Sequence, residues 1–380
     1  MLRGANLRKQ RLLLTRIKFR SMRSTVVSSR GRLVATALER SWRISPPADL
    51  DLSPAQFEEV TPLLYDSGAA ALGWWRIRET ALRKTPSGEL LHQAFRLLAL
   101  QANIHQTKIQ KLFQLMRANG VEPILLKGWA IARLYPQPAL RPYGDFDLFV
   151  RPRDSRAARR VIESEAARGS WIDLHSRLDE LPETSAEDLF ARSQLVACGD
   201  EQVRVPGAED HFALLAIHLL KHGAWRPTWL CDLGLLLESM PGNFDWDLCL
   251  GQNKRRANWI LSAIGLAHEL VGAEIADEEI AARAREIPAW LARSSLKEWE
   301  TPFAIDQPPM SHRAPMRSYL RHPRGFLSDL AHRWPNPILA TVSVNGEFNR
   351  WPRLPYQLGN CFLRVGRLVL GPQESETGAW

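Results

Sequence analysis

Apolar positions between residues 49 and 120 recur with the period of an α-helix. Ile109, Leu112, Phe113 and Met116 follow the spacing i, i+3, i+4 and i+7, and Gly120 stands where a helix C-terminal cap belongs. The stretch 41–54, rich in Pro, Ser and Asp, is typical of a linker before this segment. The pattern predicts a helical segment over 49–120 that packs on the part of the chain beyond residue 120.

Between residues 121 and 182 the apolar runs become short, as in strands. Three strands are predicted in EPILLKG (122–128), DFDLFVRP (145–152) and WIDLHSRL (171–178). Two helices are predicted between them, in WAIARLYP (129–136) and DSRAARRVIESEAARG (154–169). The sequence therefore predicts an α+β fold whose core, 121–182, is a small mixed sheet flanked by helices.

Helical periodicity returns beyond residue 183. It is clearest over 209–222, 226–240, 257–272 and 277–286. From about residue 301 the chain is rich in Pro, Arg and Trp, and the pattern defines no element there. We expect a mostly helical region over 183–300 and a C-terminal extension over 301–380.

The formal charge of +9 is unevenly distributed. Residues 1–48 contain 12 Lys and Arg and one acid, Glu39, which leaves 38 basic and 40 acidic residues in the rest of the chain. We expect residues 1–48 to form a basic, disordered tail, which is an organelle-targeting segment, a basic arm or a stretch upstream of the true start. The nearly neutral remainder gives no nucleic-acid-binding signature.

Cysteine spacing and the length of the apolar runs bear on the compartment. The four cysteines, Cys198, Cys231, Cys249 and Cys361, include no C-x-x-C pair, which argues against a disulfide framework or a zinc ribbon. No apolar run approaches the roughly 20 residues of a membrane-spanning helix. We expect a cytoplasmic protein without a membrane span.

Two carboxylates interrupt the second predicted strand. Asp145 and Asp147 are two residues apart, so they share one face, while Phe146 and Leu148 point to the other. Carboxylates held this close repel each other unless a cation lies between them, and oxygen ligands suit a hard divalent ion such as Mg²⁺. The alternative is a solvated strand end without a function.

The third predicted strand and the first helix supply further candidates. Asp173 and His175 also share a face, so three carboxylates converge if this strand lies beside the second. Such a set suits two divalent ions, Mg²⁺ or Mn²⁺, in phosphoryl or nucleotidyl transfer. Lys127 and Gly128 precede the first helix, where a glycine, free N–H groups and a positive charge can hold phosphates. A plain strand-to-helix turn is the alternative.

Histidines line the predicted helix 209–222. His218 and His222 are neighbours on one helix face, His211 precedes them, and Asp232 follows on the next helix. The H-E-x-x-H signature of zinc proteases is absent. A phosphohydrolase that binds metal through these histidines and Asp232 is one interpretation, and a wall of the acceptor pocket formed by His175, His218, His222 and Asp232 needs fewer assumptions.

The block 124–152, followed by WIDLHSRL and by EDHFALLAIHLLKHGAW (209–225), resembles the uncharacterised nucleotidyltransferase family. This family is a branch of the DNA polymerase β-like superfamily, and the resemblance covers about residues 88–240. It implies that Gly128 is the phosphate-loop glycine, that Asp145 and Asp147 are the metal pair, and that Asp173 is the third carboxylate. Trp129 stands where many superfamily members have serine.

The resemblance implies transfer of a nucleoside monophosphate from an NTP to an unknown acceptor: a small molecule, a protein or an RNA end. Asp145, Asp147 and Asp173 would bind two ions, and Asp173 could also act as base. Lys127 or Arg141 would neutralise the leaving pyrophosphate, although Arg141 could instead pair with a carboxylate and hold its loop. A non-catalytic module that binds a nucleotide or a partner remains an alternative.

Overall fold

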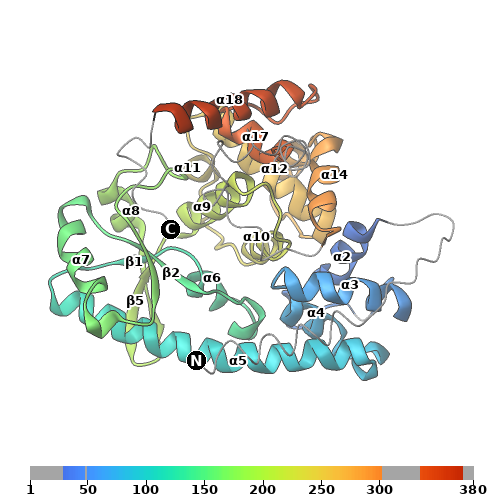
Figure 1. The fold of residues 1–380 in the computed structure, drawn as a ribbon, viewed down its shortest axis with the longest axis horizontal. Helices are drawn as coiled ribbons and strands as arrows, with labels where there is room; N and C mark the ends of the chain where they lie inside the picture. Colours follow the sequence, from blue (N-terminus) through green and yellow to red (C-terminus); the bar gives the residue numbers. More distant parts are fainter. Residues whose placement is uncertain (1–28, 48, 302–333, 371–380) are drawn as a thin grey trace, which may run out of the picture.

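A five-stranded mixed sheet lies at one side of the molecule, in the order β3-β2-β1-β5-β4 (Figure 1). The computed structural model describes residues 29–47, 49–301 and 334–370. Strand β1 pairs antiparallel with β2 and parallel with β5, and β2 pairs parallel with β3. The strands are β1 (Ile124–Leu125), β2 (Asp145–Phe149), β3 (Trp171–His175), β4 (Gln194–Cys198) and β5 (Glu201–Val205). The predicted α+β class with a small mixed sheet is confirmed.

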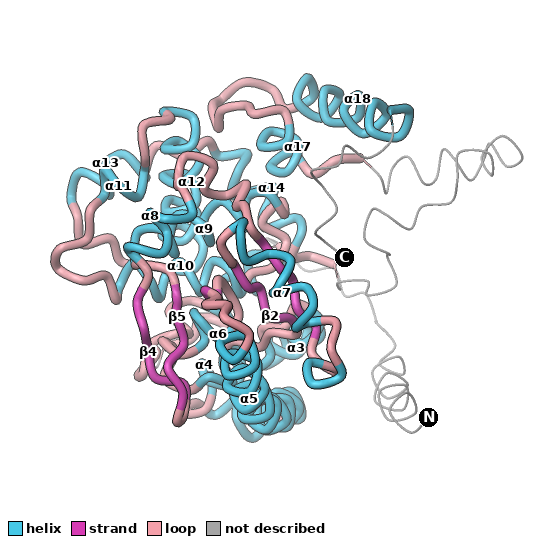
Figure 2. The backbone as a smooth tube through the Cα atoms, turned by 90° about the vertical axis from the view of Figure 1, so that its left-hand side faces the viewer, coloured by secondary structure: helices cyan, strands magenta, loops and turns pink. Residues whose placement is uncertain are grey.

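The hairpin of β4 and β5 is missing from the sequence prediction. Its strands are joined by the tight turn at Gly199 and Asp200, with a positive φ of 61° at Gly199, and they run side by side in Figure 2. β4 is an edge strand with the sequence QLVAC, whose apolar residues do not alternate with polar ones, and Leu195 in it is exposed, so the alternation typical of a half-buried strand is missing. Because β5 pairs with β1, the sheet continues beyond the predicted boundary at residue 182.

One face of the sheet packs against the C-terminal half of α5 (Pro86–Ala118) and α7 (Ser155–Ile162). The predicted helical stripe Ile109, Leu112, Phe113 and Met116 is buried there together with Phe146 and Leu148. Gly120 follows α5 with a positive φ of 73°. The prediction for this helix is therefore confirmed, and in Figure 1 α5 continues along the bottom from the sheet to α3 and α4.

The opposite face belongs to the larger hydrophobic core. Phe149 contacts Phe190 of α8 (Ala186–Arg192) at 6.1 Å between ring centroids, and Ile124 shares this core with Phe212 of α9 (Ala208–Lys221). The helices predicted within 183–300 are present. The two helices predicted between the first three strands, α6 (Trp129–Ala132) and α7, end earlier than expected. The other helices of 183–300 are α10 (Thr228–Glu238), α11 (Trp246–Leu250), α12 (Lys254–Val271), α13 (Glu278–Ala284) and α14 (Ala289–Glu298).

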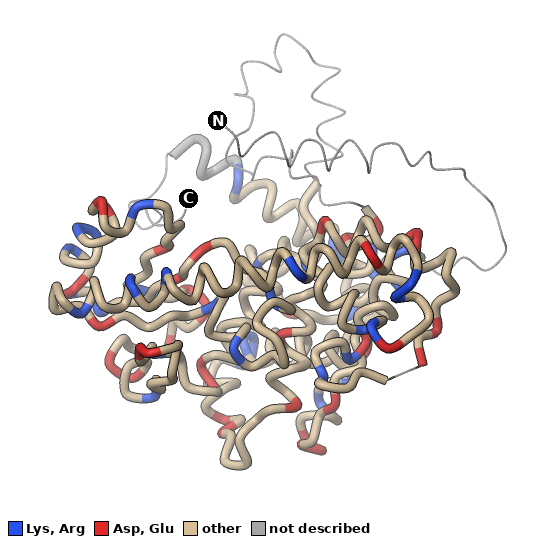
Figure 3. The backbone as a smooth tube through the Cα atoms, turned by 90° about the horizontal axis from the view of Figure 1, so that it is seen from below, with Lys and Arg blue, Asp and Glu red and all other residues tan. Residues whose placement is uncertain are grey.

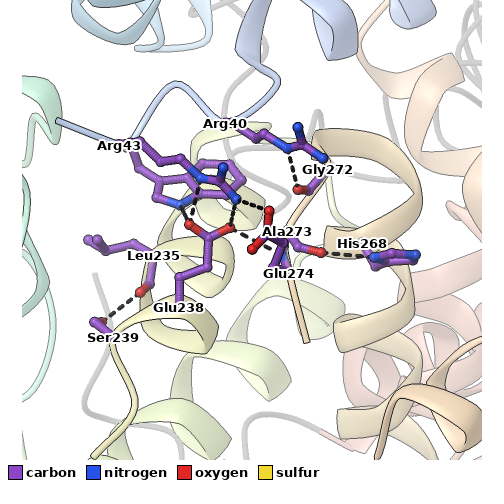
Figure 4. Close-up of polar contacts among 10 residues, drawn as sticks. Arg40, Arg43, Leu235, Glu238, Ser239, His268, Gly272, Ala273 and Glu274 are labelled. Carbon is purple, nitrogen blue, oxygen red and sulfur yellow. Dashed lines mark hydrogen bonds and ion pairs between the residues drawn. The ribbon is translucent and has the colours of Figure 1, made fainter. Parts of the chain in front are cut away.

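The prediction of a disordered tail over 1–48 is wrong for residues 30–47. Helix α2 (Arg30–Leu38) is capped by Ser29, and Trp42 behind it is 1% exposed. Arg43 binds Glu238 and Glu274, each at 2.8 Å, and the Trp42 indole donates to Glu238 at 3.0 Å (Figure 4). These contacts anchor the segment to α10. Residues 1–28 lie outside the described part of the chain.

Helices also cover the segment before α5 and part of the predicted C-terminal extension. The N-terminal ones are α3 (Pro54–Asp66) and α4 (Ala70–Ile77), as the periodicity predicted, and the C-terminal ones are α17 (Pro337–Ser343) and α18 (Leu354–Leu370). The indole of Trp259 on α12 donates to the Gly346 carbonyl at 2.7 Å, which ties α17 to the main core. Residues 302–333 and 371–380 are outside the described ranges.

Charged residues of both signs are intermingled along the described chain, as Figure 3 shows. This distribution agrees with the nearly neutral composition of residues 49–380. Among the residues described, no helix is both long and apolar enough to cross a bilayer.

Candidate functional site

The register of β2 and β3 places their carboxylates side by side. Asp147 lies opposite Asp173, and both strands run in the same direction. Asp145 and His175 are each two residues away on their own strands, so all four side chains share one face. Phe146 and Leu148 are buried on the other face, as predicted from the sequence. The strand arrangement thus brings Asp173 to the Asp-x-Asp pair.

Asp147 is the centre of this group and is 4% exposed. Its Oδ1 lies 2.8 Å from Nζ of Lys127 and 3.5 Å from Nε2 of His175. Burial alone would raise the pKa of the Asp147 carboxyl, but the approach of His175 and Lys127 outweighs it and lowers the pKa. Asp147 is therefore held as a carboxylate.

The pKa of the Asp173 carboxyl is shifted in the opposite direction, upwards. Burial raises the pKa of its carboxyl, and the charges of Asp147 and Asp145 raise it further. The strands thus hold two carboxylates where they repel each other. A cation between them relieves this repulsion, which is the electrostatic requirement of a metal site.

The donor set fits a divalent ion. One ligand atom each from Asp147, Asp173 and His175 lies within 4.8 Å of the others. Nε2 of His175 has no accessible surface and makes no hydrogen bond with any described residue, so it is available as a ligand. Two carboxylates with an imidazole suit Mn²⁺ and other transition ions better than an all-oxygen set does. Asp145 lies apart from this cluster, exposed at the start of β2.

His175 was expected in the acceptor pocket, and the structure brings it beside Asp147 and Asp173, in a group that could hold a metal ion. The sequence did indicate that His175 lies beside Asp173, because residues two apart on a strand share a face. What the sequence did not contain was the register that brings both within reach of Asp147.

Lys127 and Gly128 follow directly after β1. The N–H of Leu126 donates to the Asp147 carbonyl at 3.0 Å, so the chain passes beside Asp147 before Lys127 turns onto its carboxylate. Gly128 has φ 62° and ψ −110°, and a Cβ there would lie 3.2 Å from the ring of Tyr143. Only glycine fits this turn without strain. The phosphate-binding role of both residues stays a prediction.

Arg141 is engaged within the fold. Its Nη2 and Nε lie 2.9 and 3.0 Å from Oδ2 of Asp232 on α10, and the Tyr135 hydroxyl donates to Oδ1 at 2.8 Å. Arg141 also donates to the Pro142 carbonyl at 3.0 Å. Both charged side chains are buried. This geometry agrees with the structural alternative, in which Arg141 pairs with a carboxylate and holds the loop before β2.

His218 and His222 lie at the end of α9, beside Trp229 of α10. Their ring centroids are 4.4 Å apart, and that of His218 is 4.9 Å from Trp229. Burial lowers the pKa of His218 strongly, and the charge of Lys127 lowers it further. In the described ranges these histidines form no cluster that could hold a metal.

His211 lies elsewhere. Burial lowers the pKa of its imidazole to about 3, with smaller effects from Arg133 and Arg141. It lines a cavity of about 230 Å³ together with Arg133, and Nε2 of His211 has no hydrogen-bond partner there. His211 is not one of the residues grouped with Asp147.

A family model described as uncharacterised nucleotidyltransferase matches residues 53–272. The chain belongs to this family. The matched span runs from the start of α3 to the end of α12 and contains the whole carboxylate cluster. No curated protein and no solved structure matches the chain significantly. Membership in the nucleotidyltransferase family supports a general role in nucleotidyl transfer and an NTP as substrate.

Proposed function

We propose that the protein transfers a nucleoside monophosphate from an NTP to an acceptor at the face formed by β2 and β3. The observation that carries the proposal is the register that sets Asp147 opposite Asp173, with the His175 imidazole beside them. The family supplies the reaction class. The face is accessible, since Asp145 is exposed and Asp173, His175 and Lys127 are partly exposed.

The reaction forms a bond between an acceptor oxygen and the α-phosphorus and breaks the α–β phosphoanhydride bond, so pyrophosphate leaves. Asp147, Asp173 and His175 would hold one divalent ion, and Asp145 with Asp147 would hold a second that accompanies the NTP. When bound, such ions lower the pKa of the acceptor hydroxyl and neutralise charge on the phosphates.

The residues of the chain have distinct parts in this proposal. Asp173, on the accessible side of the cluster, would take the proton of the acceptor hydroxyl. Lys127 would move from Asp147 towards the phosphates, because an ion bound at Asp147 replaces the charge that the lysine supplies. His218 and His222, with Trp229, would form a neutral wall beside the acceptor.

The test is equilibrium binding of each NTP to the full-length protein, with Mg²⁺, with Mn²⁺ and with EDTA. The full chain is needed because a start at residue 49 removes α2 and Trp42 from the core. We expect NTP binding that requires the metal, and pyrophosphate release once an acceptor is supplied. Binding without release for every acceptor class would favour the non-catalytic module. Metal-independent binding, or none, would refute the proposal.

Direct nitrogen ligation by His175 can be tested by pulsed electron paramagnetic resonance of the Mn²⁺-loaded protein. We expect a ¹⁴N coupling from a bound imidazole, absent in His175→Gln, and a metal affinity reduced by at least about tenfold. His222→Gln is the matched control, because its ring is near Lys127 but outside the cluster. A spectrum without nitrogen coupling in the wild type would show that only oxygen ligands hold the ion.

A further inference from the structure

The candidate site contains more basic groups than the metal cluster uses, and they differ in what they bind. Lys127 is paired with Asp147, and Arg141 with Asp232. A third, Arg226, stands in the loop between α9 and α10, directly before the first turn of α10. Among the described residues its guanidinium makes no hydrogen bond and no ion pair, and its Nε has no accessible surface.

Arg226 is fixed by aromatic rings. Its guanidinium carbon lies 4.6 Å from the ring centroid of Trp225 and 5.4 Å from that of Trp229. Contact with an aromatic ring holds the planar guanidinium in one orientation, and the ring does not use up its N–H groups as hydrogen-bond donors. The two tryptophans are themselves packed edge to face at 5.3 Å, so the position of Arg226 is defined in advance of binding.

Contacts through α10 link Arg226 to the loop before β2, because its guanidinium lies over Trp229, and Asp232, three residues further along α10, binds Arg141. Burial lowers the pKa of Arg226 to about 10, and the charge of Arg141 adds to this. The charges of Asp145 and Asp232 offset part of this lowering, but neither carboxylate is bonded to the guanidinium. Burial of a cation is unfavourable, so an anion that binds the Arg226 N–H groups would be favoured there.

We propose that Arg226 binds the triphosphate of the nucleotide. The inference rests on the proposed function and assigns to Arg226 the anion contact that the sequence suggested for Arg141, whose fork is occupied by Asp232. Guanidinium binds two phosphate oxygens at once, through paired charge-assisted hydrogen bonds. Metal ions held by Asp145 and Asp147 allow the anion to approach this acidic edge.

The test compares ATP, ADP, AMP and inorganic tripolyphosphate, each with Mg²⁺, on the wild type, Arg226→Gln and Arg226→Lys. For Arg226→Gln we expect affinity for ATP and tripolyphosphate to fall about 10-fold to 100-fold, as for loss of hydrogen bonds to a charged group. AMP affinity should change by less than about twofold, and Arg226→Lys should be intermediate. Mn²⁺ binding without nucleotide should be unchanged.

Arg133→Gln is the matched control. Arg133 also has a buried Nε without a hydrogen-bond partner in the described chain, and burial alone lowers its pKa, with no contribution from Asp145. It should bind ATP like the wild type. Equal ATP affinity in the wild type and Arg226→Gln would overturn the inference, and so would parallel loss of ATP and AMP with early melting. A wild type that binds no triphosphate would instead refute the proposed function.

Discussion

Replacing Asp147 by asparagine is expected to abolish metal-dependent nucleotide binding and transfer. Asp147 faces Lys127, His175 and Asp173, and it is the carboxylate that both proposed ions share. Loss of an outer partner of a metal ligand already costs about 10-fold to 100-fold in affinity, so loss of the ligand itself should cost more than about 100-fold. Mn²⁺ binding and pyrophosphate release, both measured on the full-length chain, provide the two readouts.

Asp210→Asn is a close control for this prediction. Asp210 is 5% exposed and accepts hydrogen bonds from Arg192 at 2.7 and 3.0 Å, so it is also a buried aspartate held by a basic side chain. Both substitutions should lower stability, because each leaves a partly buried cation without its charged partner. Only Asp147→Asn should lose the metal. An Asp147→Asn protein with wild-type Mn²⁺ affinity would contradict the assignment of the site.

The grouping of Asp147 with Asp173 was largely predictable because it depends on strand periodicity. Alternation in DFDLF and WIDLH fixes which side chains share a face, and the helix between these strands favours their parallel pairing. The structure confirms this through the register of Asp147 with Asp173. The proposal of His175 as a ligand required distances between strands, and a single sequence contains none.

The partner of Arg141 could not be decided from the sequence. Arg141 precedes β2 and Asp232 lies on α10, so their contact depends on how α10 packs against the sheet. Arg226 was missed for the same reason, since its link to Arg141 runs through Trp229 and Asp232 of α10 and depends on how α10 packs against the sheet. Long-range contacts of this kind have no local signal in one chain.

Composition is a poor guide to structure at the N-terminus. The 12 basic residues of 1–48 led to the prediction of one disordered tail. Apolar positions within this segment form a pattern of their own, at Leu33, Val34, Leu38 and Trp42. Those side chains are buried in the larger core. Net charge reports on the solvated surface of a segment, whereas burial follows its apolar positions.

Breaking the Arg141–Asp232 pair is expected to give the largest loss of stability at the site. Arg141→Met leaves Asp232, whose side chain is 1% exposed, with the Tyr135 hydroxyl as its remaining hydrogen-bond donor. Removing one partner of a buried ion pair typically costs about 3–5 kcal/mol. The free energy of unfolding, measured by urea denaturation, should fall by this amount.

The double variant Arg141→Met/Asp232→Asn separates charge burial from packing. The asparagine amide oxygen can still accept from Tyr135, and no uncompensated charge remains, so the double variant should recover most of the stability lost in Arg141→Met. A single variant within about 1 kcal/mol of the wild type would show that Asp232 is not a buried charge in need of Arg141. Because this pair holds the loop that leads into β2, recovered stability should be accompanied by recovered Mn²⁺ binding at Asp147.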